Sequence, residues 1–221
     1  MISPLAQDLR YLVPNGTAET EIIVKGSAFV GTVGRAKSVK EARAFVETVR
    51  QAHPDANHYA WAYHINGLPQ PEIGSSDDGE PGGTAGRPML AVLEGRNLRE
   101  VVAVGTRYFG GTQLGMGGLV RAYSRCVRAA LEELPVAELV YHQRASISFD
   151  YSLYDSLIYL LPQYEVLIEE HSFDEHAHLT LSVPFHQGVT VSDLVRKLTN
   201  GETVLTTIWQ GGHYVKYPMQ E

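Results

Sequence analysis

The chain has 221 residues, a formal net charge of −7 and 44% hydrophobic residues, values typical of a globular protein with one large domain or two small ones. No apolar run approaches the length that spans a membrane, and the N-terminus lacks the basic start and apolar block of a signal peptide. We therefore expect a cytoplasmic protein without a membrane segment. The single cysteine, Cys126, excludes an internal disulfide and a thiolate zinc site.

Charge is unevenly distributed along the chain. Residues 1–136 contain equal numbers of basic and acidic side chains, whereas residues 137–221 carry the whole net charge of −7. This asymmetry predicts two units with different roles. Phosphate contacts dominate the affinity of proteins for nucleic acid, so the acidic second unit is expected to contact protein rather than nucleic acid.

The first 136 residues alternate between short strands and helices. Ser38 and Glu41 form a capping box, which predicts a helix that begins there and ends at His53. The spacing of apolar residues predicts the other elements, with a polar loop between residue 65 and Glu80. These elements are strands at 21–24, 28–33, 57–65 and 101–108, and helices at 84–93 and 117–134.

The remainder of the chain predicts a second domain. Strands are expected at 144–151, 166–171, 177–183 and 203–208, helices at 152–161 and 191–198, and a strand or linker at 136–142. The resulting order, β-α-β-β-α-β, is that of the ferredoxin-like split unit. We therefore predict an α+β protein with an N-terminal domain at 1–136, a ferredoxin-like C-terminal domain at 137–208 and a C-terminal tail at 209–221.

Two glycine-rich segments frame the expected strand that ends at Tyr108. We call residues 75–86 the first glycine turn and residues 109–118 the second glycine turn. The second precedes a predicted helix, so the amides of Gly110 and Gly111 are candidate ligands for phosphate. Neither a complete GxGxxG nor a Walker sequence is present. The alternative is that these glycines only permit tight turns and close packing.

An arginine stripe is expected on the helix that follows the second glycine turn. At ~100° per residue, Arg121, Arg125 and Arg128 share one flank of that helix. Such a stripe beside a glycine loop can grip a phosphate backbone, and Arg87 adds a further charge. The alternative is a solvated face on which Arg128 pairs with Glu132.

The first glycine turn is acidic. Asp77, Asp78 and Glu80 offer oxygen ligands of the kind that Mg²⁺ uses together with substrate phosphates. The alternative is that these acids cap the helix expected at Thr84, where the helix dipole favours negative charge. His58, on a preceding strand, is a candidate acid or base beside this turn.

An aromatic stripe shares one face of the expected strand at 57–65. Tyr59, Trp61 and Tyr63 alternate along it with smaller or polar residues. Such a stripe can stack nucleic-acid bases or contact another protein. The commoner alternative is that it belongs to a buried core.

Four motifs stand between Ser76 and Tyr123. They read Ser-Asp-Asp-Gly-Glu-Pro, Thr-Ala-Gly, Arg-Tyr-Phe-Gly-Gly and Gly-Gly-Leu-Val-Arg-Ala-Tyr. With these motifs the chain resembles the IMPACT family, whose bacterial members are the YigZ-like proteins, over residues 19–134. The family pattern usually has basic residues at two positions where this chain has Ala28 and Gln113.

The resemblance has implications for fold and function. It implies an N-terminal domain similar to the second domain of a small-subunit ribosomal protein and to domain IV of elongation factor G. It implies a C-terminal domain similar to domain V of that factor. Eukaryotic relatives act in translational control, so the resemblance implies translation-linked regulation with RNA or the ribosome as partner.

Two functions follow as hypotheses. In the first, a non-enzymatic protein without a cofactor binds RNA, the ribosome or another polyanion through its N-terminal domain. The residues expected to bind phosphate are Arg87, Arg107, Gly110, Gly111, Arg121 and Arg125. In the second, a Mg²⁺-dependent enzyme acts on a phosphorylated small molecule held by Arg107. Its catalytic and metal-binding residues would be His58, Asp77, Asp78 and Glu80.

Overall fold

The computed structural model describes residues 10–65, 70–201 and 212–218. The chain forms two compact units, which we call the first unit (Tyr11–Glu138) and the second unit (Leu139–Tyr217). Each unit has its own sheet and its own buried core. Among the described helices, none has the length and apolar character needed to cross a membrane.

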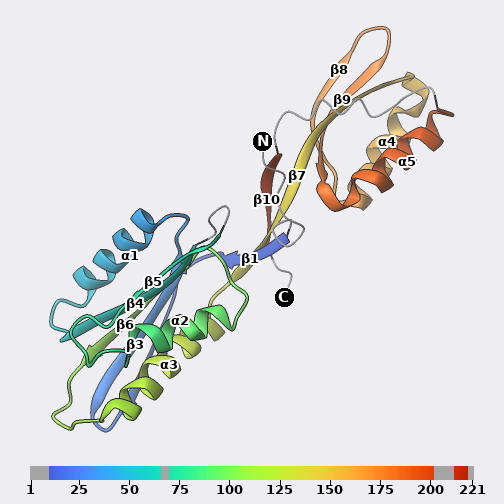
Figure 1. The fold of residues 1–221 in the computed structure, drawn as a ribbon. Coiled ribbons are helices and arrows are strands. Elements are labelled where there is room, and N and C mark those ends of the chain that lie inside the picture. The colour runs from blue at the N-terminus through green and yellow to red at the C-terminus, as the bar shows by residue number, and fades with distance from the viewer. Residues whose placement is uncertain (1–9, 66–69, 202–211, 219–221) are drawn as a thin grey trace. The chain divides into compact units, whose positions relative to one another are not determined.

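The first unit is an antiparallel sheet with helices on both faces. The strands, in the spatial order β2-β3-β6-β4-β5, are β2 (Ala18–Val24), β3 (Ser27–Arg35), β6 (Val101–Tyr108), β4 (His58–Ile65) and β5 (Glu72–Ser76). Helix α1 (Val39–Ala52) packs on one face, and α2 (Gly86–Glu94) and α3 (Met116–Glu132) cover the other (Figure 1). Ser38 accepts a hydrogen bond from the Glu41 amide at 3.2 Å, so the cap predicted for α1 is present.

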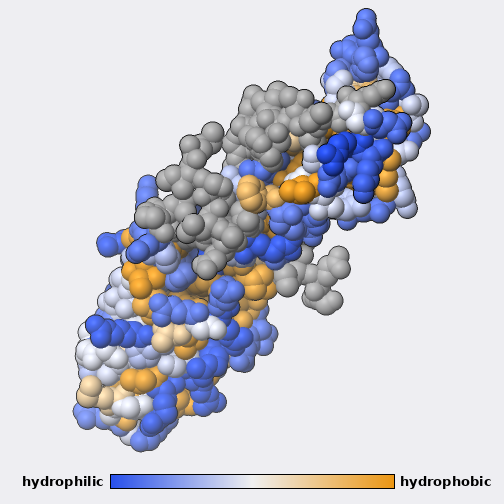
Figure 2. All heavy atoms as spheres, turned by 45° about the vertical axis from the view of Figure 1, so that its right-hand side comes forward, coloured by the Kyte–Doolittle hydropathy of each residue, from blue (hydrophilic) through white to orange (hydrophobic). Residues whose placement is uncertain are grey.

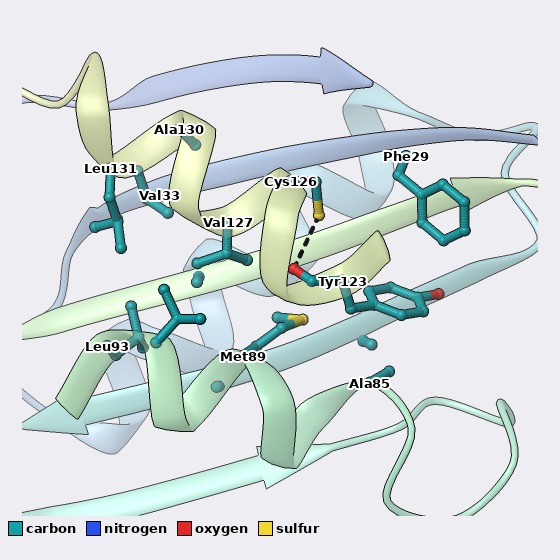
Figure 3. Close-up of a cluster of buried hydrophobic side chains, with 14 of the residues drawn as sticks. Phe29, Val33, Ala85, Met89, Leu93, Tyr123, Cys126, Val127, Ala130 and Leu131 are labelled. Atoms are coloured by element: carbon teal, nitrogen blue, oxygen red, sulfur yellow. Dashed lines mark hydrogen bonds between the residues drawn. The ribbon is translucent and has the colours of Figure 1, made fainter. Parts of the chain in front are cut away.

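The main core lies between the sheet and the helices α2 and α3 (Figure 3). The rings of Phe29 and Tyr123 pack edge to face at 5.2 Å, a contact worth about 0.5–1.5 kcal/mol beyond its buried area. A Cβ at Gly31 would lie 2.4 Å from the Cys126 carbonyl, so only glycine lets α3 approach β3 this closely. Burial raises the pKa of the Cys126 thiol to about 12, and this cysteine is a small core residue.

Helix α1 covers the aromatic stripe on the opposite face of the sheet. Tyr59 is only 5% exposed, and the rings of Trp61 and Tyr63 stack at 5.6 Å beside Val46 of α1. The stripe therefore belongs to the core. The hypothesis of an exposed aromatic surface is contradicted at Tyr59, which is buried, whereas Trp61 and Tyr63 are half-buried beside α1.

The second unit has the order β7-α4-β8-β9-α5. Its elements are β7 (Val136–Phe149), α4 (Tyr154–Leu160), β8 (Leu167–Phe173), β9 (Ala177–Pro184) and α5 (Gly188–Leu198), with short 3₁₀ helices at Tyr151–Leu153, Leu161–Tyr164 and Phe185–Gln187. In the sheet, β9 lies between β7 and β8. This order agrees with the predicted β-α-β-β-α-β unit as far as α5. The strand predicted at 203–208 lies outside the described residues.

Several strands differ from the prediction. Strand β7 is continuous, whereas two separate elements were expected, and β10 (Gly212–Pro218) pairs with β7 where a tail was expected. Two further strands were not predicted: β1 (Arg10–Pro14), which lies in the sheet of β7, and β5, which lies in the sheet of the first unit.

On the face drawn in Figure 2, hydrophilic and hydrophobic residues are mixed over the first unit. On this face, hydropathy alone therefore does not identify a functional site.

Candidate nucleic-acid interface

The two glycine turns meet at one end of the sheet of the first unit. His58 on β4 lies opposite Arg107 on β6 in the strand register. A pocket of about 410 Å³ lies at this point, between the two turns and the start of α3. Its walls include His58, Glu80, Arg107, Phe109, Gly115 and Met116. The structure thus brings together residues from both turns, although they are far apart in the sequence.

Arg107 is buried at the base of this pocket. Its Nη1 donates to both carboxylate oxygens of Glu80, at 2.8 and 3.1 Å, and the Tyr123 hydroxyl donates to the same carboxylate at 2.8 Å. The side chains of Arg107 and Glu80 are only 7% and 3% exposed. Burial and the neighbouring Glu80 carboxylate raise the pKa of Tyr123, so its hydroxyl remains a donor. The charge of Arg107 is balanced by Glu80 within the fold, which argues against its predicted role in binding phosphate.

Asp77 caps helix α2. Its carboxylate accepts hydrogen bonds from the amides of Gly83, Ala85 and Gly86 at 2.7–2.9 Å. Partial burial raises the pKa of Asp77, but these amides and nearby Arg87 outweigh that effect and lower it. Capping, the alternative to metal binding, is therefore the role that the geometry gives Asp77.

Asp78 is also engaged within the fold. Its carboxylate accepts from the Tyr59 amide at 2.8 Å and from Arg50 at 3.3 Å. The three acids of the first glycine turn thus face three different sets of partners. Within the described residues, no group of three or more histidine, cysteine or acidic side chains is placed to hold a metal ion. The three carboxylates of this turn are therefore engaged separately and do not form one ligand set for the predicted Mg²⁺ site.

His58 is held in one orientation beside the pocket. Its Nδ1 lies 2.9 Å from the carbonyl oxygen of Asp78. A carbonyl only accepts hydrogen bonds, so Nδ1 must carry the proton and Nε2 of the neutral ring is an acceptor. Since His58 lines the pocket, it brings a hydrogen-bond acceptor to the pocket wall.

The glycines of the second turn differ from one another. The amide of Gly110 donates to the Ser27 hydroxyl at 3.0 Å, and a Cβ at this position would lie 1.9 Å from the Gly26 carbonyl. Gly110 is thus needed for close packing, and its amide is not available to phosphate as predicted. Gly111 and Gly115 are exposed and have φ angles of 83° and 72°. Gly115, the N-cap of α3, has no side chain, and no side chain in the described part of the chain accepts from the first-turn amides of α3.

The predicted arginine stripe is exposed. Arg121, Arg125 and Arg128 lie on the outer side of α3 and make no hydrogen bond or ion pair with any residue that the structure describes. Glu132, expected to pair with Arg128, instead contacts Arg96 at 3.3 Å. A further groove of about 430 Å³ runs between α2 and α3 and is lined by Arg96 and Arg128.

The side chain of Arg121 lies near the start of α3. Its Nη1 lies 3.8 Å from the position that a Cβ of Gly117 would take, in the first turn of α3. Arg87 is also exposed, beside the cap of α2. The cationic residues available to a ligand are therefore on the helices and not at the base of the pocket.

Sequence reasoning missed two residues of the site. Phe109 and Met116 line the pocket, yet they are 50% and 63% exposed. The sequence contains one usable signal, because an aromatic residue directly follows a buried strand and precedes two glycines. The pairing of Glu80 with Arg107 had no such signal, since it depends on how the two turns pack.

Known families and structures match both parts of the chain. Residues 25–131 match the model of the Impact N-terminal domain, and residues 147–202 match that of a domain of unknown function, DUF1949. An IMPACT family member of Haemophilus influenzae is 39% identical over 175 residues, which cover 78% of this chain and 84% of the relative. The IMPACT family member YigZ of Escherichia coli is 34% identical over 200 residues, covering 90% and 98%. A crystal structure of a hypothetical protein matches with a TM-score of 0.59 and 31% identity, over 96% and 98%.

The fold and these matches define a two-domain protein of mixed α and β structure with an Impact domain at its N-terminal side. The chain belongs to the IMPACT family. The resemblance indicated by the four motifs is therefore confirmed.

Proposed function

We propose that this protein is a cytoplasmic, translation-linked regulator whose first unit binds RNA, the ribosome or another polyanion. The observation that carries the proposal is the outer side of α3, where Arg121, Arg125 and Arg128 are exposed and have no partner among the described residues. Arginines spaced by about one helical turn present a row of guanidinium groups that suits successive phosphates.

The arginines of the second unit differ from those of α3, and this difference supports the first unit as the polyanion-binding part. Its Arg144 pairs with Glu169 and Glu170 at 2.6 and 3.3 Å, and Arg196 pairs with Asp193 at 2.7 Å. Those charges are already neutralised on an acidic background, so they offer little to a polyanion. The acidic unit is therefore proposed to contact protein.

Family membership supports the link to translation. The proposed similarity of the two domains to domains IV and V of elongation factor G would suit a protein that approaches the ribosome, although fold similarity is an analogy and not a function. Gln113 stands beside the pocket where the family pattern is usually basic. This loss of charge predicts modest affinity, supplied mainly by α3.

The experiment is a binding titration with a fluorescent oligouridylate over a salt series from about 50 to 300 mM. The variant Arg121→Ala/Arg125→Ala/Arg128→Ala removes the stripe. Since single strands give a slope of about −0.7 per neutralised phosphate, this variant should reduce the salt slope by about 2.

A matched control removes three exposed cations from the opposite side of the sheet. In Lys37→Ala/Lys40→Ala/Arg43→Ala the net charge falls by the same amount, but the salt slope should stay close to that of the wild type. Equal losses in both triple variants would mean that binding follows net charge and not this surface. Absence of binding at low salt would refute the proposal.

A further inference from the structure

The pocket between the glycine turns has a charge balance that does not suit a phosphate. Glu80 and Arg107 form a buried pair within it, and the Nδ1 of His58 donates to the carbonyl group of Asp78. Phosphate carries one or two negative charges, and it would gain little attraction from a pair whose charges cancel. The unpaired cations lie outside the pocket, on α3.

The walls of the pocket suit a flat, neutral ring. Phe109 is half exposed. The guanidinium carbon of Arg107 lies 5.3 Å from the centroid of the Phe109 ring, so this arginine packs against one face of that ring. Met116 is 63% exposed, and Leu114 and Pro81 complete an apolar wall. Aromatic and thioether side chains of this kind stack on heterocycles.

Polar groups stand at the edges of the same pocket. The Nε2 of His58 is an acceptor when the ring is neutral, and the Gln113 amide can both donate and accept. A pocket with apolar walls and a few convergent polar groups is typical of small planar ligands. Its volume of about 410 Å³ is within the ordinary range for such sites.

We propose, on the basis of the function proposed above, that this pocket takes one unpaired nucleobase of a single-stranded nucleic acid. The base stacks on Phe109 and donates an N–H to His58 Nε2, while the adjoining phosphates lie on Arg121 and Arg125. Arg121 lies on the same helix as Met116, and its Nη1 is 3.8 Å from the position that a Cβ of Gly117 would take. Unpaired bases are commonly recognised in this manner, by an aromatic ring and by hydrogen bonds to the base edge.

The test compares an oligouridylate with an abasic strand of the same length and charge, each with three proteins. These are the wild type, Phe109→Leu, which keeps apolar volume but lacks the aromatic ring, and Phe109→Trp, which restores one. The wild type and Phe109→Trp should bind the oligouridylate about 10-fold more tightly than the abasic strand. Phe109→Leu should bind both strands equally, at the affinity of the abasic strand.

The outcomes separate this inference from the function on which it rests. If the wild type binds both strands equally, or if Phe109→Leu keeps the preference for the oligouridylate, the base pocket is refuted and polyanion binding by α3 stands. If neither strand binds at low salt, both proposals fail. Phe109 is half exposed, so its replacement should leave the melting temperature unchanged and the comparison valid.

Discussion

The two glycine turns are alike in composition and opposite in structure. In the first, the Asp77 carboxylate accepts from the amide of Gly83 in the loop and from those of Ala85 and Gly86 at the start of α2, and Glu80 is buried with Arg107. In the second, Gly111 and Gly115 are exposed, and α3 begins without a side-chain cap. The difference teaches that acidic side chains cap the helix after the first turn, whereas the second turn has no side chain that caps α3 among the described residues.

The largest expected effect comes from Arg107→Ala, which removes the ion pair between β6 and the first glycine turn. It leaves the Glu80 carboxylate buried without its cation, and breaking such a pair costs about 3–5 kcal/mol. Urea denaturation should report this loss as a lower midpoint. Arg121→Ala, on the exposed side of α3, should change stability by less than about 0.5 kcal/mol. Similar stabilities for the two variants would contradict the conclusion that Arg107 stabilises the fold through its pair with Glu80.

Gly110→Ala should have the next largest effect. Its Cβ would overlap the Gly26 carbonyl, and a backbone atom cannot move aside as a flexible side chain can. We expect a loss of about 1–3 kcal/mol in the free energy of unfolding. Gly82→Ala is the matched control in the first turn, because no atom lies within 4 Å of its added Cβ. Thermal melting of both variants distinguishes close packing from a general need for glycine.

Removal of the α2 cap should have a smaller effect. Asp77→Ala is expected to cost about 0.5–2 kcal/mol at pH 7, because three amides lose their acceptor. The exposed Asp55→Ala is the control.

The pH dependence of this cost has a defined sign. The pKa of Asp77 in the folded protein is below its ordinary value of 3.8, so its stabilising contribution is complete above that pH. The contribution is lost as the pH falls through the lower, folded value. The stability gap between wild type and Asp77→Ala, from denaturation at several pH values, should be constant near neutrality and narrow below about pH 4. A gap that widens in acid would contradict the capping role.

The smallest expected effect on stability is that of Gln113→Lys in the second turn. The side chain is exposed, so stability should stay within about 0.5 kcal/mol of the wild type. The added cation should steepen the salt slope of RNA binding by about 0.7. Thr48→Lys, at an exposed position of α1, adds the same charge on the other side of the sheet and should leave the salt slope unchanged. If both variants steepen the slope equally, the second turn has no special role.

Local signals predicted those elements whose cause is local. The capping box at Ser38 identified α1 and the apolar periodicity identified α3, because caps and amphipathic flanks depend on residues close together in the sequence. Strand β5 has five mostly polar residues, and it forms only because β4 supplies a partner. The sequence therefore predicted the first unit in outline but gave no warning of that edge strand.

The candidate site was predicted in location and less well in role. The meeting of the two turns followed from their flanking elements. The role of Arg107 did not, because a buried arginine and an exposed one look the same until the partner is known. The exposure of the α3 arginines was easier to predict, since helical periodicity alone shows which flank of a helix is polar.

The Arg107–Glu80–Tyr123 cluster also constrains the order in which the first unit assembles. Its members come from β6, from the first glycine turn and from α3, and neither ion is tolerable in an apolar setting before the other arrives. Contacts between distant segments carry a loop-closure cost and form late. We expect amides around Glu80 to be among the last to gain protection from hydrogen exchange during refolding, after the strands beneath them are already paired.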